Sequence, residues 1–263
     1  MADIRDILYS YDPHQPQDAY VSARQGMKKA LPKRFYTAVS VEAGEGGHLI
    51  LLDGKKARTP ARHPLALPNR AAADLVAAEW EAQVNEINPA EMHATRIANI
   101  GIDRVDEVRA EIIAEIAKYA TTDLVCYRAE APAELVIRES AAWDPVLHHI
   151  RARHGATFVL SQGIGFATQD AAAIDAVAQA AGRIADPIAL AALQTLVTIA
   201  GSALIPLALA DGALDAETAF AASSVDEDWN AQLWGADEEA EFRRARRWAE
   251  FSAAAGLLRA LNG

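Results

Sequence analysis

The side chains best suited to chemistry in this sequence are seven histidines and one cysteine. Only His148, His149 and His154 lie close together along the chain, and Asp144 precedes His148 by four residues, so these two could share a helix face. Such a pair offers nitrogen and oxygen ligands to Zn²⁺, but a zinc site needs a third ligand at a compatible spacing, and none is evident. We therefore expect no metal site and interpret these histidines as solvated side chains near a helix end.

Three further patterns resemble functional sites, but the sequence around each lacks features that the site would need. Gly163-Ile164-Gly165 lacks the third glycine and the strand-to-helix frame of a dinucleotide-binding loop. Cys126 lies in an apolar run, which favours a buried small hydrophobe over a nucleophile. Asp226-Glu227-Asp228 lacks the spaced oxygen ligands and the glycine of a calcium-binding loop. No pattern selects a catalytic residue or a cofactor, so a binding protein is favoured, and an enzyme with an unmarked carboxylate site is the alternative.

The composition narrows the class of protein and its partners. Of 263 residues, 51% are hydrophobic and 23% are charged, which is typical of a folded globular chain. Acidic residues outnumber basic ones by 36 to 25, and the resulting net charge of −11 disfavours nucleic acid and anionic lipid as partners. The single cysteine excludes a disulfide framework. Alanine is abundant and aromatic residues are few, so we expect mostly helix.

Two segments bear on location. The N-terminus has no apolar signal-peptide core and is too acidic for a transit peptide, so we expect a bacterial cytoplasmic protein or one from a compartment whose targeting peptide is missing here. Residues 187–210 contain no charge and could span a bilayer by length, but they include Gln194 and Pro206 and have no basic flanks. We predict a buried helix instead, with Ala200-Gly201 allowing close approach of a neighbouring helix. Its core residues would be Leu190, Leu193, Val197 and Leu204.

The elements that must position these residues fall into two parts. Residues 36–41 and 48–52 have the composition of strands on either side of a glycine-rich turn at 44–47, and residues 55–59 suggest a third strand. Asn69 is a natural N-cap for a helix whose apolar stripe is Val76, Trp80 and Val84, and we expect Trp80 to pack between that helix and the sheet.

The rest of the chain has helical periodicity. Helices are expected from Asp103, from Pro132 to Gly155, and at successive starts beyond Asp170, with a short β-like interruption at 157–168. The predicted fold class is α+β: a small N-terminal domain of β-hairpin, sheet and helix (1–95), then a larger all-helical domain (96–263). The break should fall between Asn88 and Arg104, and residues 1–33 read as a polar arm.

Several segments in register resemble one known family, the assembly chaperones that act on the α subunit of the F-type ATP synthase catalytic head. The resemblance covers about residues 34 to 251, and its strength lies in the number of motifs rather than in any one. The motifs are RFYTAVSV (34–41), LLDGKKARTP (51–60), AAEWEAQ (77–83), INPAEM (87–92), YATTDLVCYRAEAPAEL (119–135), AAWDPVL (141–147), AGSALIPLALADG (200–212) and SSVDEDWNAQLWGADEEAE (223–241).

This resemblance implies a protein without catalytic activity or cofactor. It implies binding to the unassembled α subunit and shielding of the surface that a β subunit later covers. Relatives occur in the mitochondrial matrix and in α-proteobacteria, and the missing transit peptide favours a bacterial, cytoplasmic member. We expect no stable membrane insertion, and a monomer when the protein is free.

The segment between Asp226 and Glu241 is the predicted contact with the α subunit. It holds seven acids, no base and two tryptophans, a composition that suits a basic, partly apolar partner surface. Helix capping by Asp237 and an i, i+4 pair of Glu239 with Arg243 would explain only some of these acids. Glu239 is the best single candidate for the contact. The other predicted contact residues are Glu238, Asp237, Trp234, Trp229 and Asp228.

Overall fold

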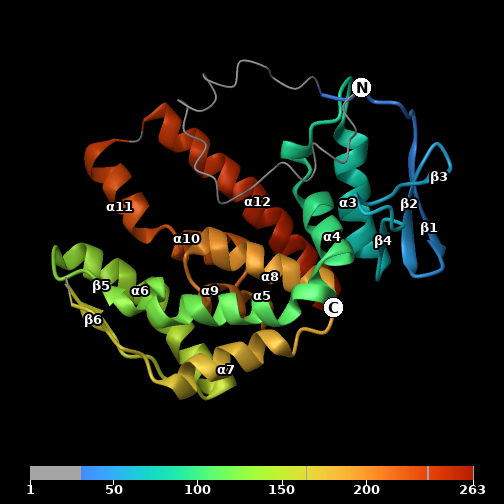
Figure 1. Ribbon diagram of the computed structural model, residues 1–263. Helices are drawn as coiled ribbons and strands as arrows, with labels where there is room; N and C mark the ends of the chain where they lie inside the picture. The colour runs from blue at the N-terminus through green and yellow to red at the C-terminus, as the bar shows by residue number, and fades with distance from the viewer. Residues whose placement is uncertain (1–30, 164, 236, 263) are drawn as a thin grey trace, which may run out of the picture. The chain divides into compact units, whose positions relative to one another are not determined.

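The computed structural model describes residues 31–163, 165–235 and 237–262 (Figure 1). The chain divides into two compact units that meet between Asp103 and Arg104. A small sheet lies in the first unit and the second is mainly helical, so the predicted α+β class with a larger helical part is confirmed. The predicted polar arm, residues 1–33, lies almost entirely outside the described residues.

The sheet of the first unit is centred on its second strand. Strands β1 (Val39–Gly44) and β2 (Gly47–Leu52) form the predicted antiparallel hairpin, and β3 (Lys55–Lys56) and β4 (Ala66–Leu67) both pair with β2. At the start of β2, Gly47 has a φ of 125°, and a Cβ there would lie 2.3 Å from the carbonyl oxygen of Leu67. Only glycine therefore fits between the hairpin and β4.

Helix α3 (Arg70–Ala82) covers this sheet. The side chain of Asn69 accepts a hydrogen bond from the Ala72 amide at 2.9 Å, which confirms the predicted N-cap. Trp80 is buried as predicted: its ring meets that of Tyr36 edge-on at 5.8 Å between centroids, and the Tyr36 hydroxyl donates to the Trp80 carbonyl oxygen at 2.7 Å. The assignment of Val84 to the apolar stripe is wrong, because the helix ends at Ala82 and Val84 is 77% exposed.

Helix α4 (His93–Asp103) follows a 3₁₀ turn, η1 (Pro89–Glu91), and belongs to the first unit. The carboxylate of Glu79 in α3 accepts hydrogen bonds from the amides of Ala94 and Thr95 and from the Thr95 hydroxyl, at 2.7, 2.7 and 2.8 Å. These bonds fasten the start of α4 to α3. The division of the chain consequently follows α4, whereas the sequence places the boundary at 95/96.

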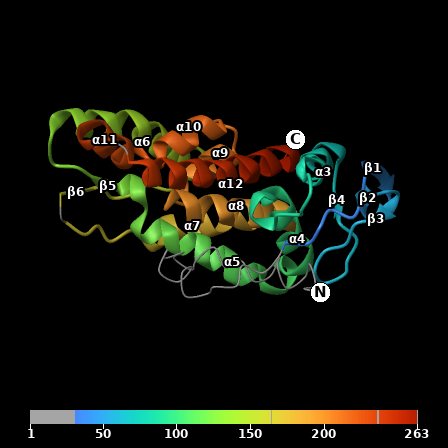
Figure 2. The same cartoon turned by 90° about the horizontal axis from the view of Figure 1, so that it is seen from above.

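Helices pack on one another through most of the second unit (Figure 2). Gly155, in the left-handed conformation with a φ of 71°, ends α6 as predicted. Among its described residues, the predicted β-like stretch at 157–168 contributes only the short strand β6, which pairs in parallel with β5. The elements are α5 (Val105–Tyr119), η2 (Ala120–Thr122), η3 (Leu124–Cys126), β5 (Tyr127–Arg128), α6 (Ala133–His154), β6 (Ser161–Gln162), α7 (Ala171–Gly182), α8 (Pro187–Ala200), α9 (Leu204–Ala210), α10 (Ala216–Ala222), α11 (Val225–Trp234) and α12 (Glu238–Asn262).

The uncharged stretch from Pro187 to Ala210 forms two helices, α8 and α9, where the sequence predicted one. Gly201 has a φ of 63° and caps α8, and a Cβ there would meet no atom within 4 Å. The glycine thus serves the left-handed turn, and in the part of the chain that the structure describes no neighbouring helix requires a glycine at position 201. Among the described residues no helix has both the length and the apolar character needed to cross a membrane. The predicted core residues Leu190, Leu193, Val197 and Leu204 are all buried.

Candidate partner-binding surface

The predicted contact segment forms a sharp corner between α11 and α12. Gly235, with a φ of 83°, ends α11, and Asp237 starts α12 by accepting a hydrogen bond from the Ala240 amide at 2.6 Å. The predicted N-cap at Asp237 is therefore confirmed. We call residues 233–242, apart from the undescribed position 236, the α11–α12 corner (Figure 1).

Large apolar side chains are exposed at this corner. Trp234 is 85% exposed, Phe242 63% and Leu233 54%. Exposing such side chains to water costs free energy, because each loses the roughly 1.5–3 kcal/mol that full burial would contribute. The sequence pattern predicts Trp234 as a contact residue but not Leu233 or Phe242. The signal that could have found them is apolar residues placed on both sides of a helix break in an acidic segment.

Acidic side chains lie among these apolar ones. Glu238 and Glu239 are exposed in the first turn of α12, where the helix dipole favours negative charge. Glu239 makes the predicted i, i+4 ion pair with Arg243 at 2.6 Å, with 80% and 59% of the two side chains exposed. Such an exposed pair contributes little to stability, so Glu239 is free to exchange Arg243 for another cation.

Two acids of α11 are instead engaged in helix packing. Asp228 pairs with Arg244 at 2.5 Å, and Glu227 pairs with Arg247 at 2.7 Å. Arg247 also donates to the carbonyl oxygen of Ile199 at 3.1 Å. These pairs fasten α11 to α12. Asp228, a predicted contact residue, therefore has a structural partner already.

Trp229, another predicted contact residue, is buried with only 7% of its surface exposed. The guanidinium of Arg138 in α6 lies 4.8 Å from its ring centroid, and Arg138 also donates to the Gln232 side chain at 2.6 Å. Trp229 and Arg138 thus hold α11 against α6. Of the six predicted residues, the structure brings Trp234, Asp237, Glu238 and Glu239 together at the exposed corner.

The structure brings His149 and His154 together but leaves His148 outside this cluster. His148 is exposed, and Asp144 pairs with Arg128 at 2.8 Å instead of joining His148. The interpretation of all three as solvated is wrong for His154, whose side chain is 5% exposed. His149 and His154 both contact Asp211, which follows α9 and is 57 residues from His154. Sequence spacing gives no signal for a partner so distant.

Cys126 is fully buried, and burial raises the pKa of its thiol to about 12. At neutral pH it is a thiol and not a nucleophilic thiolate, as the sequence predicted.

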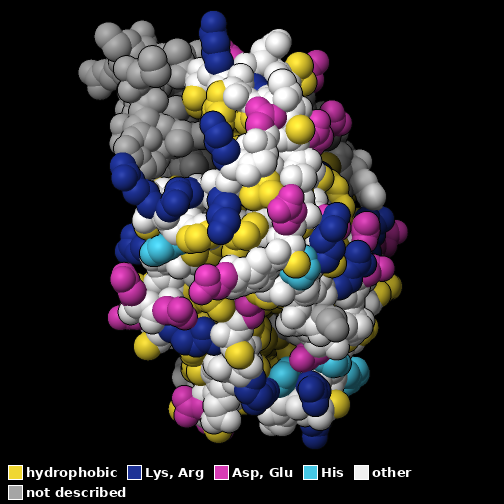
Figure 3. All heavy atoms as spheres, turned by 90° about the vertical axis from the view of Figure 1, so that its right-hand side faces the viewer, with side chains coloured by type: hydrophobic (Ala, Val, Ile, Leu, Met, Phe, Trp, Pro, Cys, Tyr) yellow, Lys and Arg dark blue, Asp and Glu magenta, His cyan; other side chains and the backbone are white. Residues whose placement is uncertain are grey.

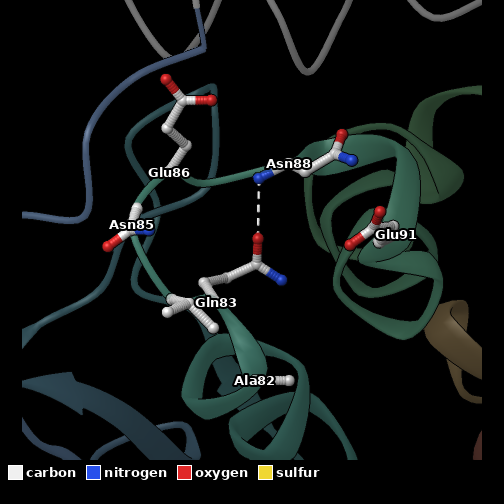
Figure 4. Close-up of a pocket in the computed structure, with 7 residues that line it drawn as sticks. Ala82, Gln83, Asn85, Glu86, Asn88 and Glu91 are labelled. Carbon is white, nitrogen blue, oxygen red and sulfur yellow. Dashed lines mark hydrogen bonds between the residues drawn. The ribbon is translucent and has the colours of Figure 1, made fainter.

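A shallow pocket of about 440 Å³ lies in the first unit, beyond the end of α3. Gln83 accepts a hydrogen bond from the Asn88 amide at 2.7 Å across it (Figure 4). Its two carboxylates, Glu86 and Glu91, come from different segments and do not point toward each other in Figure 4. The pocket therefore offers no carboxylate pair for general acid–base chemistry. The remaining lining residues are Ala82, Val84 and Asn85.

On the face drawn in Figure 3, acidic and basic side chains alternate with scattered hydrophobic ones. Mixed charge of this kind is usual for a solvated protein surface. Among the described side chains on that face, the acidic residues form no broad patch.

Comparison with known proteins gives a consistent family assignment. The family model described as ATP12 chaperone protein matches residues 33–151. A protein of Agrobacterium tumefaciens, provisionally assigned as a chaperone, is 43% identical over 98% of this chain and 94% of its own, with a TM-score of 0.84. Atp12 from Paracoccus denitrificans is 36% identical over 88% of this chain and 99% of its own, with a TM-score of 0.79. A lysine-substituted variant of the Paracoccus protein matches with the same TM-score at 35% identity.

Proposed function

This chain belongs to the ATP12 chaperone family, whose role is assembly of the ATP synthase, and from that membership we propose that it binds the unassembled α subunit of the F-type enzyme. In this proposal the bound chaperone shields the α-subunit surface that a β subunit later covers. It acts by binding alone, as a monomer when free, in the bacterial cytoplasm.

The observation that carries the proposal is the exposure of Trp234 beside Glu238 and Glu239. Tryptophan is the residue type most enriched where protein interfaces derive their affinity, and a solvated chain gains nothing from leaving one 85% exposed. Burial of Trp234, Leu233 and Phe242 against a partner would supply the apolar part of the binding free energy.

The surrounding acids supply the polar rim of such a contact. Glu238 and Glu241 make no ion pair with any residue in the described part of the chain, and Glu239 is held only by an exposed arginine. These acids complement a basic rim on the α subunit and speed its encounter with the chaperone. Because rim charges are screened by salt, the contact can hold a subunit and still release it to a competing partner.

The direct experiment is capture of a purified, tag-free α subunit by the immobilised chaperone. We expect a one-to-one complex that the Trp234→Ser variant weakens by at least tenfold, since central tryptophans contribute about 2 kcal/mol or more. Ile137→Ser is the matched control, because Ile137 is 67% exposed on α6, outside the corner. Failure of the wild type to bind the α subunit would reject the proposal. Equal loss in both variants would reject the corner as the contact.

The alternative, an enzyme with an unmarked carboxylate site, gains no support from the pocket beyond α3. The same capture experiment separates the two, because an enzyme of small-molecule metabolism has no reason to retain an ATP synthase subunit.

A further inference from the structure

We propose that His149, His154 and Asp211 form a binding site for a divalent transition metal ion, with Zn²⁺ the best match. The Nε2 atoms of His149 and His154 lie 2.9 and 2.7 Å from the same oxygen, Oδ2 of Asp211. All three potential ligand atoms lie within 4.8 Å of one another. Two imidazole nitrogens and one carboxylate oxygen are a typical ligand set for zinc, with water in the fourth position.

Zinc would enter this cluster with small movements. Zinc lies about 2.0–2.2 Å from such ligands, so tetrahedral ligand atoms are about 3.3–3.5 Å apart. The two observed nitrogen–oxygen distances are shorter than this by roughly half an ångström, and the ion would replace the two hydrogen bonds that now join the ligands.

The backbone around the cluster is well fixed. His149 and His154 lie on the last turns of α6, Asp211 follows α9, and these two helices pack together. The side chains of His154, Asp211 and His149 are 5%, 18% and 25% exposed. The ligands are therefore held in place and partly shielded, while the site stays open to an ion from solvent.

Arg183 controls the state of this site. Its Nη2 lies 2.9 Å from Nδ1 of His154, and a guanidinium can only donate, so Nδ1 must accept. The proton of the neutral ring then resides on Nε2 and is donated to Asp211. A metal needs the lone pair of Nε2, so the proton must move to Nδ1 and Arg183 must withdraw. Arg183 is exposed and can turn into solvent.

The second nearby cation limits the affinity. Arg153 lies 3.9 Å from Oδ1 of Asp211 and is 67% exposed. It engages the carboxylate oxygen that the metal does not need, but its charge opposes a dication. We therefore expect a single site of micromolar affinity that cross-links α6 to the segment after α9.

The test is titration of the tag-free, metal-stripped full chain with Zn²⁺ by calorimetry, repeated with Co²⁺ to read ligand number from its visible absorption. We expect one ion per chain and a Tm that rises with metal. His154→Gln and Asp211→Asn should each weaken binding at least tenfold, and His148→Gln, on the same helix but outside the cluster, should not. Circular dichroism without metal shows whether each variant is folded.

The Arg183→Gln variant tests the tautomer argument. The side-chain oxygen of the introduced glutamine can accept a hydrogen bond from Nδ1–H of His154 and so orient the ring for the metal. The Zn²⁺ affinity should therefore rise by about tenfold. Zn²⁺ binding that survives both His154→Gln and Asp211→Asn, or no binding by folded wild type, would overturn the site. Weaker binding by Arg183→Gln would contradict the role given to Arg183.

Discussion

The hydroxyl of Ser202 donates a hydrogen bond of 2.6 Å to the carboxylate of Asp123, which lies 79 residues earlier in the chain and is completely buried. The same carboxylate accepts from the amides of Ala203 and Leu204 at 2.7 and 3.1 Å. These amides are at the start of α9, where a helix has no partners of its own for its first N–H groups. Asp123 is thus the N-terminal cap of a helix to which it is not adjacent in sequence.

Removal of this carboxylate should be costly. Asp123→Ala leaves three buried amides, those of Val125, Ala203 and Leu204, and the Ser202 hydroxyl without their acceptor, and each unsatisfied group costs about 1–3 kcal/mol. We expect the free energy of unfolding to fall by about 3 kcal/mol or more in urea titrations. Asp186→Ala is the matched control: Asp186 caps α8 through one bond to the Ala189 amide, so its loss should cost about 1 kcal/mol. An equal fall in the free energy of unfolding for both variants would show that Asp123 stabilises the protein no more than an ordinary helix cap does.

The same group predicts a pH dependence. Burial raises the pKa of Asp123 to about 6, although its four hydrogen bonds act in the opposite direction. In the unfolded chain the pKa is about 3.9, so the folded state binds more protons between these two values. The stabilisation that the folded state gains by holding this proton is therefore fully present below about pH 4 and is lost as pH rises through about 6.

Comparison with a non-titrating variant isolates this effect. From pH 4 to pH 7 the stability of the wild type relative to Asp123→Asn should fall by about 2 kcal/mol, since a pKa difference of about two corresponds to about 2.7 kcal/mol in full and part of this is already lost at pH 4. Urea unfolding at both pH values provides the measurement. A constant difference would mean that Asp123 ionises in the folded protein as readily as in water.

Trp80 offers a test of packing against partner binding. Trp80→Arg inserts a charge at a residue that is only 5% exposed. We expect the free energy of unfolding to fall by about 3–5 kcal/mol, as it does when a buried Phe or Trp is replaced by alanine. Val84→Arg, four residues later and 77% exposed, should change stability by less than about 0.5 kcal/mol. Thermal melting compares the two. A Trp80→Arg variant that melts like wild type but no longer captures the α subunit would assign Trp80 to the contact surface.

A pair of carboxyl groups between α6 and α11, Glu139 and Asp226, should show a pH dependence of the same sign as Asp123. Burial raises the pKa of Glu139, and the neighbouring Asp226 carboxylate raises it further, against a 2.8 Å hydrogen bond from the Ala129 amide. Glu139→Gln keeps an acceptor for that amide. Its new NH₂ group can donate to Asp226, whose Oδ1 is buried and has no hydrogen-bond partner among the described residues.

We therefore expect Glu139→Gln to stabilise the fold at pH 7 by more than the roughly 0.5 kcal/mol typical of a neutral surface change. Because the raised pKa makes wild-type Glu139 protonate as pH falls, the advantage of glutamine should shrink toward pH 4. Chemical unfolding at both pH values measures it. A variant less stable than wild type at pH 7 would show that Glu139 is needed as a charged partner of the nearby Arg128.

Local patterns in the sequence predicted the structure well where they were strong. The cap at Asn69, the glycine that ends α6 and the i, i+4 pair of Glu239 depend only on residues a few positions apart, and all are confirmed. The helix break at Gly201 was missed because glycine serves both close packing and left-handed turns, and sequence alone does not separate these uses.

Relationships across long stretches of chain could not be predicted. The pairing of Asp211 with His149 and His154, and the capping of α9 by Asp123, depend on how helices pack and leave no spacing signal. The sequence also could not predict that Trp229 is buried while Trp234 is exposed. Both tryptophans lie in one acidic segment, and only tertiary contacts distinguish them.

Glu239 provides the sharpest test of the proposed contact with the α subunit. Glu239→Lys places a positive charge beside Arg243 at the exposed corner, where the lost pair contributes only about 0.3–0.5 kcal/mol to stability. The fold should therefore persist, while repulsion from a basic partner rim should weaken binding several-fold, mainly by slowing association. Wild-type binding should itself weaken as salt rises from low to physiological concentration, and the variant should lose part of that dependence.

Asp175→Lys on α7 makes the same change in net charge on the opposite side of the helical unit in Figure 1, and should leave association unchanged. Association rates from surface plasmon resonance separate the two variants: if both slow binding equally, the effect belongs to the overall charge of −11, and the contact with the α subunit lies elsewhere.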